Sequence, residues 1–170
     1  MTEIDYTYFQ FVNLPDEKRV ELQELYLVQK PFDVDCMNWK WGDVKWVQDT
    51  LMSDCTYSDI LEVARKESKK LNEHSSANVV FNMFNSIKKS IEAITKIEGE
   101  SLAYQQTAKE MAASDAVGGF ARFGTLPQTL SMVGVIAGSV REVEDYEWST
   151  VFNAMVYKHT EGLYQKQLYK

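Results

Sequence analysis

One stretch of 23 residues, from Ser76 to Glu98, carries the strongest folding signal in this chain. Its large apolar residues recur at alternating spacings of four and three, which is the repeat of one face of an α-helix. They are Val80, Phe84, Ile87, Ile91 and Ile94. At about 1.5 Å per residue, such a helix is roughly 34 Å long. It cannot bury this stripe alone, so other segments or a partner must cover it.

The composition of the whole chain also favours helices. Its 170 residues are 45% hydrophobic, which is enough for one domain with a core. Three prolines and eight glycines are too few for a β-sandwich of many turns. We therefore expect a mainly α fold, a single-domain bundle of about six to seven helices. Residues 36–170 are expected to form one compact unit, and residues 1–35, an N-terminal arm and first helix, its most separable part.

The N-terminal arm is rich in aromatic residues. Tyr6, Tyr8, Phe9 and Phe11 fall within the run YTYFQFV, whose composition is typical of a strand. We predict an extended arm. Two placements stay open, one against a neighbouring subunit and one as an anchor against the protein's own core.

A second aromatic group follows at Trp39, Trp41 and Trp46. These residues accompany a helical stripe, and they either clamp this short helix to the core or contact another protein, because Trp is enriched at interface hot spots. The two aromatic groups together are the candidate protein-contact residues of the chain.

Caps, prolines and glycines predict the remaining helices. Pro15, followed by two acidic residues, starts a helix that runs to about Gln29, because Pro31 prevents its extension. Thr56 or Ser58 caps the next helix. Further helices are predicted over residues 100–117, 126–138 and 147–168, with a short helix or turn over 139–145.

Few residues suggest chemistry. Glu98 stands where the apolar stripe requires an apolar residue, so it either ends the buried zone or pairs with a base. His159 shares an apolar face of the last helix, where we expect a core histidine. Cys36 and Cys55 form no CxxC and no zinc-site spacing with the two histidines, and we expect two ordinary thiols. We therefore predict no catalytic residues, cofactor or metal.

Charge and hydropathy narrow the choice of partners. The net charge of −7 opposes contact with phosphate, so direct nucleic-acid binding is not expected. An uncharged run of 18 residues lies between Arg122 and Arg141. Its apolar part, Met132 to Ala137, is too short to cross about 30 Å of hydrocarbon. We expect a buried helix there, with membrane insertion as the alternative.

The order of several segments supports a resemblance to a known group. They are WGDVKWVQDTL, YSDILEVA, KIEGESL, GGFARFGTLPQTL and EWSTVFNAMVYKHTEGLYQKQL. Over residues 41–168 this layout resembles small helical proteins encoded among the structural genes of tailed bacteriophages, including tail-assembly-chaperone-like proteins and neck or baseplate components. The resemblance rests on the spacing of these segments and on the residues that begin and end them, and it assigns no site residues.

The resemblance implies a non-enzymatic structural component of a phage particle, at the tail, neck or baseplate. Such a protein is made in the host cytoplasm and resides in the virion. Its partners would be other virion proteins or copies of itself, contacted through helix faces and the N-terminal arm. The alternative is a tail-assembly chaperone that shields an apolar segment of another virion protein.

Overall fold

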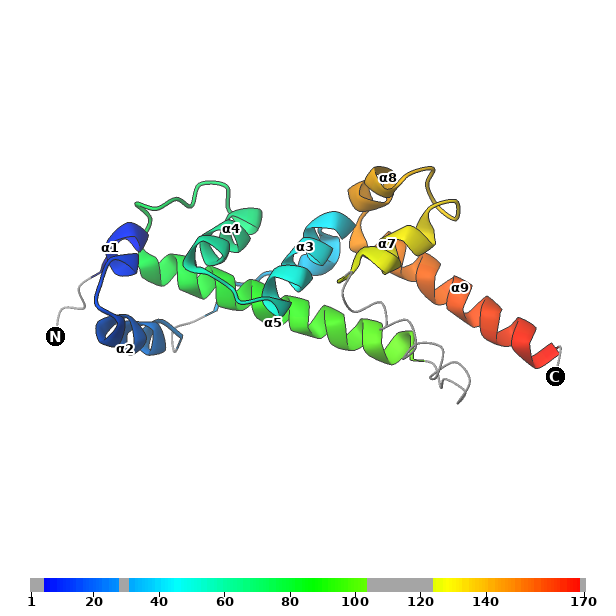
Figure 1. Ribbon diagram of the computed structural model, residues 1–170, viewed down its shortest axis with the longest axis horizontal. Helices are drawn as coiled ribbons and strands as arrows, with labels where there is room; N and C mark the ends of the chain where they lie inside the picture. The colour runs from blue at the N-terminus through cyan, green and yellow to red at the C-terminus, as the bar shows by residue number, and fades with distance from the viewer. Residues whose placement is uncertain (1–4, 28–30, 104–123, 169–170) are drawn as a thin grey trace. The chain divides into compact units, whose positions relative to one another are not determined.

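The computed structural model describes residues 5–27, 31–103 and 124–168. Within these residues there are eight α-helices, isolated β-bridges and no strand, so the mainly α fold is confirmed (Figure 1). The helices are α1 (Tyr8–Val12), α2 (Asp16–Leu27), α3 (Trp41–Met52), α4 (Tyr57–Glu67), α5 (Ala77–Ser101), α7 (Leu126–Met132), α8 (Val140–Asp145) and α9 (Trp148–Leu168). A 3-10 turn, η1, covers Cys36–Asn38.

The chain divides into two compact units. The first unit combines residues 1–36 with 50–92, and the second combines 37–49 with 93–170. Helices α3 and α5 each contribute residues to both units. The expected division after residue 35 therefore differs from the observed one, because residues 50–92 complete the unit to which the N-terminal residues belong.

The first helix of unit 1 corrects the prediction of an extended arm. Thr7 begins α1 with a capping box: its side chain accepts a hydrogen bond from the Gln10 N–H at 3.2 Å. In return, the Gln10 side chain accepts the Thr7 N–H at 3.0 Å. These two bonds satisfy backbone N–H groups that, in a strand, would have to pair with a neighbouring strand. YFQFV is therefore helical despite its strand-like composition.

The aromatic side chains of α1 build the core of unit 1. The Phe11 side chain is fully buried, with its ring edge-on to Phe81 at 4.9 Å between centroids. Tyr26 and Tyr57 pack on the same ring. Tyr8 donates its hydroxyl to the Tyr57 carbonyl at 2.5 Å, and burial raises the pKa of this phenol. Of the two placements left open for this segment, the structure shows the anchor against its own core.

Helices α4 and α5 follow their sequence signals. Thr56 caps α4 through a reciprocal pair of bonds with Asp59, as one of the two cap predictions stated. The apolar stripe of α5 is buried, apart from Phe84, which is half-buried. The helix continues through Gly99 to Ser101, further than the stripe itself extends. Most of the helix predicted over residues 100–117 lies outside the described residues.

Unit 2 is built on α3, α7, α8, α9 and the last part of α5. A short antiparallel pairing joins the start of α3 to the start of α9: the Trp41 N–H donates to the Tyr146 carbonyl at 2.7 Å, and the Trp148 N–H to the Trp39 carbonyl at 2.8 Å. Helices α8 and α9 both pack on α7. The long last helix and the short helix before it confirm two predictions.

Helix α7 is shorter than predicted. It ends at Met132 and not at Gly138, because the chain turns back immediately afterwards. Gly134 has a φ of 81° and donates its N–H to the Ala137 carbonyl at 2.7 Å. This backbone conformation suits glycine and excludes a continuing helix.

Candidate functional site

A buried network of charged and polar side chains lies inside unit 2. The ammonium group of Lys45, on α3, is 2.7 Å from Glu98 Oε1, on α5. The indole N–H of Trp148, at the start of α9, donates to the same oxygen at 2.7 Å. Gln48 donates to Glu98 Oε2 at 3.1 Å and accepts from Lys45 at 2.9 Å. Three helices are therefore joined through one carboxylate.

The two charges of this network are compensated within the unit. Lys45 is 4% exposed and Glu98 is 7% exposed. Burial lowers the pKa of the Lys45 ammonium, while the neighbouring Glu98 carboxylate acts in the opposite direction. The Lys45 ammonium also lies 4.2 Å from the centre of the Trp41 ring. Both oxygens of Glu98 accept hydrogen bonds, so the arrangement stabilises charge in the core.

The sequence predicted half of this network. Glu98 on an apolar face was expected either to end the buried zone or to pair with a base, and the pairing is confirmed. Its partner was missed because Lys45 is 53 residues away along the chain. One signal was present: Lys45 follows the buried Trp41 by one helical turn, so the two share a face of α3.

A small hollow lies beside the network. It has a volume of about 220 Å³ and is lined by Trp46, Asp49 and Thr125 among others. The Asp49 carboxylate accepts the Thr125 backbone N–H at 3.0 Å and its hydroxyl at 2.9 Å. Thr125, the N-cap residue of α7, thus uses its side chain to hold the start of α7 against α3.

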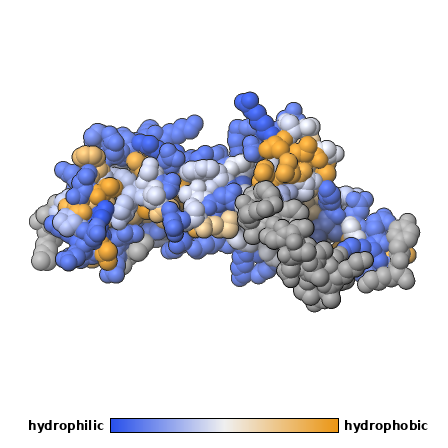
Figure 2. Space-filling model, in the orientation of Figure 1, coloured by the Kyte–Doolittle hydropathy of each residue, from blue (hydrophilic) through white to orange (hydrophobic). Residues whose placement is uncertain are grey.

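An exposed apolar surface lies on α7 and the turn that follows it. Leu126, Leu130 and Val135 are 44%, 51% and 49% exposed, and we call these three residues the α7 patch. Figure 2 shows hydrophobic residues gathered over this part of unit 2. The opposite face of α7 is buried through Thr129 and Met132. A helix that is apolar on its outer face as well is typical of a surface that contacts another molecule.

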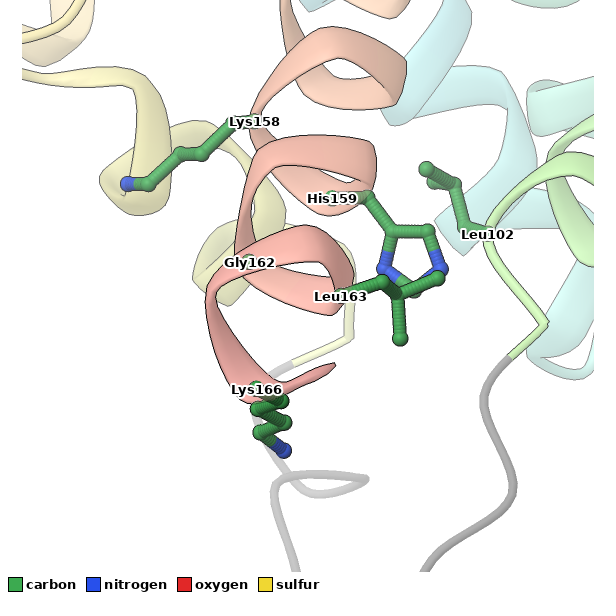
Figure 3. Close-up of a pocket in the computed structure, with 6 residues that line it drawn as sticks. All are labelled: Leu102, Lys158, His159, Gly162, Leu163 and Lys166. Carbon is green, nitrogen blue, oxygen red and sulfur yellow. The ribbon is translucent and has the colours of Figure 1, made fainter. Parts of the chain in front are cut away.

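A groove runs along α9. It consists of two hollows, of about 240 and 260 Å³, which share Leu102, Lys158 and His159. We call it the α9 groove; its other lining residues are Ser131, Met132, Met155, Gly162, Leu163 and Lys166. In Figure 3 the His159 ring and Leu163 face Leu102. His159 is thus on a partly exposed apolar face, at the edge of the core.

The structure separates the seven aromatic candidates for partner contact by burial. Tyr8 and Phe11 are buried in unit 1, and Trp41 is buried in unit 2, where it donates its indole N–H to Thr129 at 2.8 Å. Tyr6, Phe9, Trp39 and Trp46 keep some exposed surface, and Phe9 keeps the most, at 57%. The candidates are therefore not brought together into one surface.

The two cysteines are free thiols in unit 1. Cys36 is buried and donates its backbone N–H to Ser90 Oγ at 3.0 Å. Burial raises the pKa of the Cys36 thiol to about 11 and also raises the pKa of the partly exposed Cys55 thiol. Both shifts lower the reactive thiolate fraction at neutral pH.

Among the described residues, no cluster of three or more His, Cys, Asp or Glu side chains is placed to hold a metal ion. No helix in these residues has both the length and the apolar content to cross a membrane. No family model, curated protein or solved structure matches this chain significantly. The surfaces and the buried network above are therefore what a functional hypothesis must use.

Proposed function

We propose that this protein is a non-enzymatic structural component of a bacteriophage particle, at the tail, neck or baseplate. The observation that carries the proposal is the α7 patch, an apolar surface on a helix whose other face is already buried. The layout of residues 41–168, which resembles virion-associated helical proteins, supplies the setting. The protein is made in the host cytoplasm and acts in the virion.

The mechanism is burial of the α7 patch against a neighbouring subunit. Apolar surface gains about 25 cal/mol for each Å² removed from water. A standard interface buries about 1,600 Å² in total, so the patch forms the apolar centre of a contact whose rim is polar. The neighbour is another virion protein or a second copy of this chain. The exposed Phe9 is a second contact residue on unit 1.

The alternative function is a tail-assembly chaperone. The same apolar patch suits transient shielding of an apolar segment in another virion protein. The two functions differ in what remains after assembly. Mass spectrometry of purified particles finds a structural component at fixed stoichiometry and does not find a chaperone.

The test changes the α7 patch and follows incorporation into particles. Leu130→Lys should reduce incorporation at least about tenfold. A buried charge at the centre of the contact makes the binding free energy less favourable by well over 1.4 kcal/mol. Val20→Lys, on α2 of unit 1, is the matched control, because Val20 is 59% exposed and outside the patch. The same two variants should differ in molar mass by light scattering if the neighbour is a second copy. Equal incorporation of both variants would rule out the α7 patch as the contact.

A further inference from the structure

Helix α7, which carries most of the α7 patch, is too short to be stable alone. It has seven residues, Leu126–Met132. Isolated helices of fewer than about 12 to 15 residues are marginal in water, so a helix of this length depends on contacts with the rest of the fold. Its N-cap residue, Thr125, makes no side-chain hydrogen bond to the helix itself. The order of α7 must therefore come from other elements of unit 2.

Two side chains of α3 bond to the start and the middle of α7. At the start, the Asp49 carboxylate accepts both the backbone N–H and the hydroxyl of Thr125, at 3.0 and 2.9 Å. In the middle, the Trp41 indole N–H donates to the Thr129 hydroxyl at 2.8 Å, and both of these side chains are buried. Trp41 and Asp49 are about two turns apart on α3, so one helix fixes two points of α7.

The far end of α7 is fixed by α9. The Lys158 ammonium donates to the Ser131 carbonyl at 3.0 Å (Figure 3). This carbonyl belongs to the last turn, where a helix leaves its carbonyl groups without partners inside the helix. The next residue, Met132, is 1% exposed. With both ends and the inner side fixed, α7 presents Leu126 and Leu130 to solvent.

The residue before Thr125 leaves room for the Asp49 carboxylate. Gly124 has a φ of 55°, a backbone conformation that suits glycine. A Cβ at Gly124 would lie 2.6 Å from Asp49 Oδ1, the oxygen that accepts the Thr125 N–H. Any other side chain at this position would therefore displace the carboxylate from the start of α7.

We propose that Asp49 is a positioning residue for the α7 patch. Its two bonds to Thr125 keep α7 folded, with Leu126 and Leu130 exposed, so the contact surface is complete before the partner arrives. A surface fixed in advance avoids the entropy cost of ordering side chains and backbone on binding. The inference rests on the proposed function, because it takes the α7 patch as the contact surface.

The first test measures hydrogen exchange in the full chain. In Asp49→Ala the backbone amides of α7 should exchange at least about tenfold faster, because two bonds that keep the helix folded are lost. The amides in the first turns of α9 should keep their rates. Asp145→Ala is the matched control, because it removes the same charge from unit 2 and breaks an exposed ion pair with Lys40. Equal acceleration in α7 and α9 would overturn the proposal, since Asp49 would then stabilise unit 2 as a whole.

The second test measures incorporation into particles. A binding surface that is folded a tenth of the time binds its partner about tenfold more weakly, so Asp49→Ala should be incorporated about tenfold less than the unchanged chain. Asp145→Ala should be incorporated normally. Normal incorporation of Asp49→Ala together with loss of Leu130→Lys would overturn the positioning role alone. Normal incorporation of both Asp49→Ala and Leu130→Lys would overturn the proposed function.

Two variants of Thr125 give the same test if Asp49→Ala does not fold. Thr125→Val removes the hydroxyl bond and keeps the N–H bond, so incorporation should fall about threefold. Thr125→Ser keeps the hydroxyl and should be incorporated like the unchanged chain. A role in packing alone predicts the reverse order, because valine has the shape of threonine and serine does not. That reverse order, or equal incorporation of the two variants, would contradict the proposal.

Discussion

At the scale of single residues, the buried Lys45–Glu98 pair is the most consequential feature. Its desolvation is offset only while each charge keeps its partner and its additional hydrogen bonds. The pair also holds Trp148, whose indole N–H shares Glu98 Oε1 with the ammonium. Removing one partner therefore leaves an uncompensated charge and an unpaired donor in the same place.

We predict that Glu98→Ala lowers the free energy of unfolding by about 3–5 kcal/mol. The double variant Lys45→Met/Glu98→Leu should recover most of that loss, because no buried charge remains. Urea denaturation followed by circular dichroism measures both. Glu92→Ala is the control: Glu92 is exposed, 4.0 Å from Lys88, and such surface pairs are worth about 0.3–0.5 kcal/mol. A loss for Glu98→Ala no larger than the control's would contradict this account.

The sequence allowed the core role of Glu98 to be predicted, but not its partners. A carboxylate on an apolar stripe is a local anomaly, visible within one helix. The choice of Lys45 depends on how α3 and α5 meet in unit 2, which no local pattern encodes. The α9 groove was missed for the same reason: His159 was placed on an apolar face of the last helix, but Leu102 lies just after the end of α5.

At the scale of elements, helices with a long apolar repeat or a side-chain cap were predictable. Helices α4, α5 and α9 begin or repeat as the sequence indicates. The failures are short elements. The five residues of α1 depend on a capping box that was not recognised, and α7, predicted over residues 126–138, stops at Met132 before a turn at Gly134. In both predictions the residue types of the segment were weighed more heavily than the local hydrogen bonds that the chain forms.

The cap of α4 gives a test that depends on pH. Thr56→Ala should lower stability by about 1 kcal/mol at neutral pH, whereas Ser58→Ala, inside the first turn, should stay within about 0.5 kcal/mol. Thermal melting of the two variants measures this difference.

The pH dependence follows from Asp59. Hydrogen bonds from the Thr56 hydroxyl and N–H lower the pKa of the Asp59 carboxyl in the folded protein. A lowered folded pKa gives stability that is present above the unfolded pKa and is lost as pH falls through the folded one. The effect of Thr56→Ala should therefore shrink in acid, and an effect independent of pH would contradict the assignment.

At the scale of the whole molecule, the division into two units predicts which helices a destabilising substitution affects. Phe11→Ala removes a fully buried ring from unit 1 and should cost about 3–5 kcal/mol. Hydrogen exchange should then accelerate in α4 more than in α9, since each unit has its own core. Phe9→Ala, two residues away in the same helix but 57% exposed, should change exchange little. Equal acceleration in α4 and α9 would show that the chain opens as one cooperative unit.

The distribution of tryptophan has a spectroscopic consequence. All four tryptophans of the chain, Trp39, Trp41, Trp46 and Trp148, belong to unit 2, and the aromatic core of unit 1 is built from tyrosine and phenylalanine. Light emitted after excitation at the red edge of the absorption band therefore comes from unit 2 alone. The Trp148 ring stacks on Phe152 at 4.7 Å and touches a carboxylate, so its emission reports the state of the buried charge pair. The chain therefore carries an intrinsic fluorophore in unit 2, and unit 1 gives no emission at that excitation wavelength.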